Sequence, residues 1–236
     1  MVTAGTVEVW LIQTDLPDPV IAGLETLLDD DERARACALL DPGRGRRFVA
    51  SHGAVRVILG HRLGVAPESL RWRYGPNGKP ELAGTEAHVS LSHSGGLAAL
   101  AMTGRRRVGV DIQEVRPGLA ATRMATRFYP AAEARYVMAG HGPAGQAGRF
   151  TQLWARKEAC LKVTDGRLMS GLQQVVLGTG PADGEQGGTP LIRDLRVPPG
   201  FRAAVAAEGA TPYRVRRRWW PGREPGNRPE SRNHQS

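Results

Sequence analysis

The chain has 236 residues, two cysteines and a formal net charge of +9 at pH 7. A globular chain of this length buries roughly 70–75% of its unfolded surface and needs no disulfide or metal to stabilise it. The two cysteines form neither a disulfide framework nor a zinc motif, which excludes the disulfide-rich secreted class. No apolar run approaches the ~20 residues of a membrane helix, and the N-terminus lacks the pattern of a signal peptide. We therefore expect a soluble cytoplasmic monomer with no membrane partner.

The positive charge is concentrated at the C-terminus. Residues 214–236 hold seven Arg and two Glu, which gives +5 of the +9. Their Pro, Gly, Asn and Arg content is not that of a hydrophobic core, so we expect residues 214–236 to form a basic, disordered tail. A basic balance favours anionic partners, namely phosphates, nucleic acid or acidic proteins.

The first predicted elements are a strand and two helices. Residues 7–13 ("VEVWLIQ") read as a strand, and residues 18–40 read as one helix with leucines on its apolar side. Asp41 followed by Pro42 is a helix start, because a carboxylate can cap the first turn and proline fits the first helical position. We expect the second helix to run from there to about residue 64.

Turn-linked strands and further helices should follow. The stretches "LRWRY", "GPNGKP", "AHVSLSHS" and "GGLAALAMT" predict short strands joined by turns, and "VGVDIQEV" predicts another strand after a second turn. The remaining elements are helices at about 118–139 and 146–164, a strand near 172–177, a Gly-rich loop at 178–188, and further strands.

One internal similarity suggests two related halves. "GGLAALA" (95–101) matches "GFRAAVA" (200–206) in register, 105 residues further along the chain. Seven residues are a short match, but the offset is nearly half of the folded part. We therefore expect two similar lobes that meet near residues 104–107. The predicted division is an N-terminal lobe at 1–105, a C-terminal lobe at 106–213 and the basic tail at 214–236.

The strand "VGVDIQEV" places a carboxylate beside a glycine. Alternation puts Gly109, Asp111 and Gln113 on one face and Glu114 on the other, unless a bulge intervenes. Glycine leaves room for another group to approach the backbone. Taken alone, an Asp near the end of a buried strand is more often a turn former than a ligand.

Lysine is rare in this chain, and its positions are informative. The chain has 29 arginines but only three lysines, Lys79, Lys157 and Lys162. In "LWARKEACLK", Glu158 and Lys162 are four residues apart and so lie on one helix face, where a plain ion pair would contribute only ~0.2–0.5 kcal/mol. Arginine would serve equally well in such a pair, whereas lysine offers a compact charge that can be tuned. We therefore expect these lysines to meet a phosphate or a reacting hydroxyl.

The pair "VGVDIQEV" and "TQLWARKEACLKV" resembles the signature of the 4′-phosphopantetheinyl transferases of the longer, two-lobed Sfp type. "GPNGKPEL", "VSLSHSGG" and "RFYPAAE" resemble other blocks of that type, in the expected order, over roughly residues 30–206. The resemblance implies an α+β fold of two similar lobes related by a pseudo-two-fold axis, each an antiparallel sheet with helices. It also implies that coenzyme A lies in the cleft between the lobes.

The activity implied by this resemblance is a phosphopantetheine transfer. The arm of coenzyme A passes to a serine hydroxyl of an apo acyl or peptidyl carrier domain of a polyketide, peptide or fatty-acid synthase. The other product is adenosine 3′,5′-bisphosphate. Mg²⁺, with Mn²⁺ as an alternative, takes hard oxygen ligands, and often one or two carboxylates plus phosphates and water.

The resemblance also assigns residues to roles. Asp111 and Glu158 would hold the metal ion, with Gln113 contributing through water or weakly, because many members carry a second acid at that position. Glu158 and Lys162 would handle the serine proton and the phosphates, with Glu133 assisting. The coenzyme A phosphates would be held by Lys79, Ser92, His93, Arg47 and Arg33.

Two other functions fit parts of the sequence. A nucleic-acid-binding protein would account for the basic balance and the Arg/Trp-rich tail, but more than half of the charge lies in that tail and no recognition motif appears elsewhere. A non-catalytic relative that binds coenzyme A is the second alternative, and Gln113 is its only support. A serine hydrolase built on His93 is disfavoured, because no G-x-S-x-G motif is present.

Overall fold

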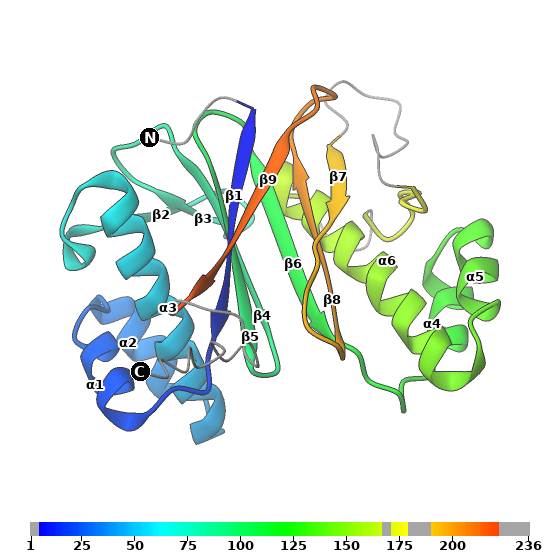
Figure 1. The fold of residues 1–236 in the computed structure, drawn as a ribbon, viewed down its shortest axis with the longest axis horizontal. Coiled ribbons are helices and arrows are strands. Elements are labelled where there is room, and N and C mark those ends of the chain that lie inside the picture. The colour runs from blue at the N-terminus through cyan, green and yellow to red at the C-terminus, as the bar shows by residue number, and fades with distance from the viewer. Residues whose placement is uncertain (1–4, 167–170, 179–189, 222–236) are drawn as a thin grey trace, which may run out of the picture.

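The computed structural model describes residues 5–166, 171–178 and 190–221. Two β-sheets face each other at the centre, with α1, α2 and α3 on one side and α4, α5 and α6 on the other (Figure 1). The α+β class predicted from the sequence is confirmed. None of the helices in the described part of the chain combines the length and the hydropathy needed to cross a membrane.

The first sheet has the strand order β4-β5-β1-β9. Its strands are β1 (Thr6–Gln13), β4 (His88–Ser94), β5 (Leu97–Thr103) and β9 (Arg214–Trp220). A separate hairpin is formed by β2 (Trp72–Tyr74) and β3 (Pro80–Leu82). β5 pairs antiparallel with both β1 and β4.

The segment predicted as one helix over 18–40 is two helices, α1 (Asp18–Glu25) and α2 (Asp30–Cys37). The interruption is caused by Asp29, whose side chain accepts a hydrogen bond from the backbone N–H of Glu32 and starts a new helix with a capping box. The next helix, α3 (Pro42–Leu63), begins after Asp41 as predicted, and the Asp41 side chain accepts from the N–H of Gly43.

The second half of the chain forms the sheet β6-β8-β7 and three helices. The predicted helix over 118–139 is divided at Pro130, whose ring is incompatible with a continuous helix. The strand predicted near 172–177 is wrong, because residues 171–178 form turns. The elements are β6 (Val108–Glu114), α4 (Ala121–Phe128), α5 (Ala131–Met138), α6 (Gly142–Thr164), β7 (Leu191–Asp194) and β8 (Phe201–Ala207).

The two halves share one topology. Each half has a strand, a long helix and a further antiparallel pair, and its last strand lies in the middle of the sheet: β1, α3, β4, β5 in one and β6, α6, β7, β8 in the other. The matching sequences "GGLAALA" and "GFRAAVA" form the starts of β5 and β8, the two central strands. This shared order is the similarity that the internal repeat indicated.

Buried apolar side chains fill three layers, between α3 and the first sheet, between the two sheets, and between the second sheet and α6. The helix α6 therefore packs on the second sheet through the cluster that contains Leu153 and Ile192. Glu158 and Lys162, described below, belong to the same helix, so its packing fixes where their charges point.

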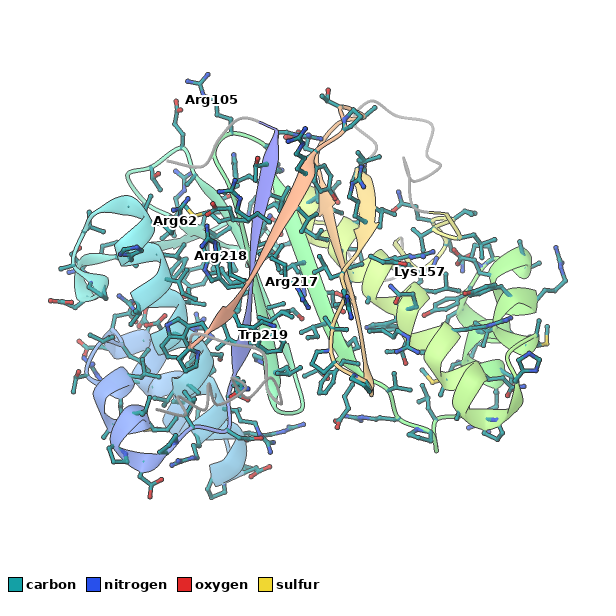
Figure 2. The ribbon with its side chains drawn as sticks, viewed as in Figure 1. Arg62, Arg105, Lys157, Arg217, Arg218 and Trp219 are labelled. Atoms are coloured by element: carbon teal, nitrogen blue, oxygen red, sulfur yellow. The ribbon has the colours of Figure 1, made fainter. Side chains whose placement is uncertain are left out.

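The prediction that residues 214–236 form a disordered tail is wrong for its first part. Residues Arg214–Trp220 form β9, which pairs in parallel with β1, so that Val215 lies beside Val7 and Trp219 beside Leu11. Trp219 packs on the apolar layer between the sheets, while Arg217 and Arg218 leave the strand on opposite sides (Figure 2). The rest of the predicted tail, from residue 222, lies outside the described residues.

Truncation should separate these two parts of the C-terminus. Deleting residues 214–236 is expected to lower the free energy of unfolding by about 3 kcal/mol or more, because two partly buried tryptophans and a whole strand are lost. Deleting residues 222–236 leaves β9 in place and should change the free energy of unfolding little. Chemical unfolding of the two truncated proteins measures the difference, and equal losses of stability would contradict the role given to β9.

Candidate functional site

Three serines join the two sheets at the candidate site. Ser90, Ser92 and Ser94 alternate along β4, and their hydroxyls accept hydrogen bonds from alternate backbone N–H groups of β6. The donors are the N–H groups of Val110, Ile112 and Glu114, at 3.1, 3.4 and 3.0 Å respectively. Side-chain hydroxyls thus replace a backbone ladder where the two halves of the chain meet.

Asp111 lies at this junction and is surrounded by donors. The residue is 2% exposed, and its Oδ1 accepts hydrogen bonds from Ser92 Oγ at 2.6 Å and from Lys162 Nζ at 2.8 Å. Its Oδ2 accepts from Gln113 Nε2 at 2.9 Å. β6 pairs with β8 without a bulge, so Gln113 shares the face of Asp111 as predicted and Glu114 does not. A buried carboxylate with these partners is held in a single orientation by charge-assisted hydrogen bonds.

Gly109 allows α6 to approach β6 closely. A Cβ atom at this position would lie 2.0 Å from the carbonyl oxygen of Ala159, so any other residue would push the helix away. The close contact brings Lys162 to the strand, where Nζ also donates to the carbonyl oxygen of Val110 at 3.0 Å. The glycine beside Asp111 therefore admits a helix that carries charged side chains.

Glu158 is the second carboxylate of the site. It is half-buried, one turn before Lys162, and it lines the cavity described below. Burial and the nearby charge of Asp111 raise the pKa of Glu158, and the charge of Lys162 acts in the opposite direction. Among the residues that the structure describes, no hydrogen bond or ion pair holds the Glu158 carboxylate. The site thus contains two carboxylates whose charges interact. Asp111 is held by hydrogen bonds, whereas Glu158 has none among the described residues.

The two carboxylates fit a divalent cation. Within residues 5–166, 171–178 and 190–221 no group of three or more His, Cys, Asp or Glu side chains could hold a metal ion by itself. Two repelling carboxylates next to a cavity nevertheless match the pattern in which Mg²⁺ takes one or two protein carboxylates and completes its shell with phosphates and water. The donor set of Asp111 and Glu158 is therefore compatible with the predicted metal ion.

The cavity beside Glu158 has a volume of about 310 Å³. Its lining combines charged side chains, among them Lys79, Glu158 and Lys162, with apolar ones, among them Val55 and Leu100. A concave site with apolar walls and a few converging charged groups is typical of a small-molecule pocket. Its walls come from both halves of the chain.

Lys79 lines the cavity and connects the two halves of the chain. Its Nζ donates to the carbonyl oxygen of Val108 at 3.0 Å and to that of Lys162. The loop that carries it is fixed by the N–H of Asn77, which donates to Asp165 Oδ2 at 3.1 Å. Burial lowers the pKa of Lys79 to about 8, with a further contribution from the charge of Arg107. Lys79 therefore lies between the two halves and bonds to the backbone of Lys162, and its predicted contact with the coenzyme A phosphates stays a prediction.

The opposite wall contains a charged network that the sequence interpretation missed. Buried Glu32 accepts from Arg56 Nε at 2.6 Å and from Trp72 Nε1 at 3.1 Å, and its Oε1 lies 3.3 Å from His52 Nδ1. Burial alone would raise the pKa of Glu32, but the hydrogen bonds with His52 and Arg56 lower it to about 2. The sequence does contain one sign of this network. Asp29 and Glu32 have the three-residue spacing of a capping box, which predicts that their side chains lie at a helix start.

Several predicted site residues do not line the cavity. Arg33 pairs with Asp30 at 2.7 Å, and its neighbour Arg35 reaches the cavity instead. Arg47 lies 3.3 Å from Asp15 on the exposed side of α3.

The other two phosphate candidates lie next to each other on β4. His93 is exposed, and Ser92 is buried against Asp111. Ser92 thus orients a carboxylate, while the phosphate contacts predicted for His93, Arg33 and Arg47 stay predictions.

Glu133 lies apart from the cavity. It is fully buried, its Oε2 lies 2.6 Å from Lys157 Nζ, and its Oε1 accepts from the N–H of Val176 at 2.6 Å. Both carboxylate oxygens are therefore engaged inside the helical layer. This geometry does not support the predicted role of Glu133 in handling the serine proton.

Comparison with known proteins gives a consistent result. Residues 107–191 match a family model described as the 4′-phosphopantetheinyl transferase superfamily. The chain is 34% identical over 182 residues to HetI, a 4′-phosphopantetheinyl transferase of Nostoc, with 75% of this chain and 76% of that protein aligned. It is 33% identical over 172 residues to slr0495 of Synechocystis, described as a candidate enzyme of the same kind, with 72% and 69% aligned.

A more distant similarity covers about half of the chain. AcpT of Salmonella typhi, also a 4′-phosphopantetheinyl transferase, is 36% identical over 118 residues, which are 50% of this chain and 59% of that protein. The region matched by the family model includes Asp111, Glu158 and Lys162.

Proposed function

This chain belongs to the 4′-phosphopantetheinyl transferase family, and we propose that it transfers the phosphopantetheine arm of coenzyme A to a serine hydroxyl of an apo carrier protein. The single observation that carries the proposal is that Glu158 and Lys162 line one cavity while Asp111 lies directly behind them, bonded to Lys162 and in electrostatic contact with Glu158. The attacking hydroxyl belongs to the partner, so the enzyme has to supply a base and positioning rather than a nucleophile.

Asp111 and Glu158 would hold Mg²⁺ against the pyrophosphate of coenzyme A. The bound ion would stabilise the negative charge that develops on the pyrophosphate oxygens as the phosphorus is attacked. Glu158 is also the group suited to accept the serine proton, because its pKa is raised and no other side chain in the described part of the chain holds its carboxylate. Lys162 keeps Asp111 oriented and places a positive charge beside the phosphates.

Coenzyme A would enter the cavity between the two halves of the chain. Lys79 lines it as a positive group for the phosphates, and apolar lining residues such as Val55 and Leu100 offer a surface for the less polar parts of the molecule. The proposed partner is an acidic acyl or peptidyl carrier domain of a polyketide, peptide or fatty-acid synthase, which suits the basic balance of the chain.

A transfer assay tests this function. The protein is incubated with coenzyme A, Mg²⁺ and an apo carrier protein, and the intact mass of the carrier is measured. A mass gain equal to the phosphopantetheine arm, absent when the carrier serine is replaced by alanine, is the expected result. An unchanged carrier mass, together with normal binding of coenzyme A, would instead identify a non-catalytic relative.

The shorter C-terminal deletion distinguishes transfer from nucleic-acid binding. Transfer should survive deletion of residues 222–236, because β9 and the cavity are kept. A nucleic-acid binder would lose the share of its affinity and salt dependence that Arg223, Arg228 and Arg232 contribute. Deletion from residue 214 is unsuitable for this comparison, since it also removes β9.

The pH dependence of kcat/KM for coenzyme A should show whether the charge of Lys79 is needed for binding. Below pH 8 the ammonium is charged and can bind phosphate; above its pKa of about 8 it is neutral. We therefore expect kcat/KM for coenzyme A to fall by up to about tenfold per pH unit above pH 8. The Lys79→Arg protein, whose guanidinium stays charged, should lack this alkaline fall. If its profile still falls at the same pH, Lys79 is not the titrating group.

A further inference from the structure

Lys157 is fully buried, on the side of α6 that faces α4 and α5 (Figure 2). Its Nζ lies 2.6 Å from Glu133 Oε2, donates to the carbonyl oxygen of Gln174, and sits 4.9 Å from the centre of the Tyr129 ring. An ammonium group has three N–H donors and here it has three acceptors, two oxygens and an aromatic face.

This environment explains why the chain uses lysine here. The planar guanidinium of arginine carries five donors in a fixed fork, and it would need more space and more acceptors than this pocket provides. The other oxygen of Glu133 accepts from the N–H of Val176. Together the two side chains connect α5, α6 and residues 171–178 through a buried ion pair and two charge-assisted hydrogen bonds to backbone groups.

The buried pair is adjacent in sequence to the candidate catalytic carboxylate. Consecutive residues of an α-helix point about 100° apart, so the direction of Lys157 determines that of Glu158. Lys157 faces the helical layer, whereas Glu158 and Lys162 line the cavity. The contact of α6 with Gly109 fixes the helix on its strand side, and the Lys157–Glu133 pair fixes it on the far side.

We propose that the buried Lys157–Glu133 pair acts as a positioning device that holds α6 in the rotation at which Glu158 and Lys162 face Asp111. This inference rests on the proposed function, because it gives Glu158 and Lys162 their catalytic roles. Lys157 and Glu133 touch neither substrate nor metal in this account. Glu133 is thus needed for transfer, but through another residue rather than as a proton acceptor.

A purely structural role is the alternative, and the chain offers a matched control. Arg156, the preceding residue of α6, pairs with Asp194 of β7 at 2.6 Å and donates to the carbonyl oxygens of Val176 and Leu177. This pair also ties α6 to residues 171–178, but from the side of the second sheet. Loss of either pair should destabilise the protein. Only loss of the Lys157–Glu133 pair should allow α6 to rotate about its own axis.

The test compares Lys157→Met, Glu133→Gln, the double variant with both changes, and the control Asp194→Asn. Either single change leaves a buried charge unpaired and should lower Tm by on the order of 10 °C. The double variant removes both charges and should regain most of that Tm. We expect its kcat to stay at least about tenfold below that of the unaltered protein, with KM for coenzyme A within about twofold. Asp194→Asn should lower Tm but keep kcat within about twofold.

Two results would overturn the proposal. One is a double variant that regains kcat together with Tm, and the other is an Asp194→Asn protein that loses kcat by the same factor. If the unaltered protein transfers nothing, the proposed function fails, and amide hydrogen exchange still tests the positioning. The N–H of Val176 and the turn of α6 at 157–162 should exchange faster in the double variant than in Asp194→Asn, and equal rates would exclude the device.

Discussion

Replacement of Glu158 by glutamine is expected to lower kcat/KM for transfer by about a thousandfold while the protein keeps its fold. The amide has nearly the same shape, but it removes the negative charge that would bind the metal ion and the base that would accept the serine proton. Glu158 is half-buried, and no described partner depends on its charge for an ion pair, so stability should change little. Transfer rates and Tm of the variant are the measurements.

Glu114→Gln is the matched control for this change. Glu114 is an exposed acid at the end of β6, on the opposite face of the strand from Asp111. Its replacement should leave kcat/KM within about twofold, since it faces away from the candidate metal site. Near-normal turnover of the Glu158→Gln protein would overturn the assignment of the site.

The second large effect is expected for Lys162→Arg, which should lower kcat by about a hundredfold. The compact ammonium of Lys162 donates to Asp111 Oδ1 and to the carbonyl oxygen of Val110 at a place where α6 touches β6. A guanidinium is longer and planar, so it cannot make both bonds without displacing the helix or Asp111.

Lys79→Arg is the comparison for this variant, because it makes the same exchange at the other lysine of the cavity. Its loss should be smaller below pH 8, since a charge toward the phosphates is retained. Initial rates at saturating coenzyme A measure the loss of kcat in each of the two variants. Full activity of Lys162→Arg would show that a compact charge is not required at this position.

Local patterns predicted the elements that carry the site. The alternation in "VGVDIQEV" correctly placed Asp111 and Gln113 on one face of a strand, and the spacing of Glu158 and Lys162 correctly placed both on one helix face. Such patterns follow from backbone periodicity alone and need no knowledge of the rest of the fold. That β6 and α6 meet came from the resemblance to a family, because no local pattern specifies a contact between residues so far apart.

The errors have physical causes in long-range contacts. Residues 214–220 looked like a tail because four of the seven residues are arginine, yet β9 is stable through pairing with β1 at the other end of the chain. The surroundings of Glu133 were unpredictable for a similar reason. Its sequence context resembles a catalytic block, but its carboxylate contacts Lys157 and Val176, which reach it only in the folded structure.

The most direct test of the central claim is the binding of Mn²⁺ in the presence of coenzyme A, followed by electron paramagnetic resonance. The account predicts one bound ion in the unaltered protein, and at least about tenfold weaker binding in both Asp111→Asn and Glu158→Gln, while Glu114→Gln binds normally. Unchanged Mn²⁺ affinity in both of the first two variants would contradict it.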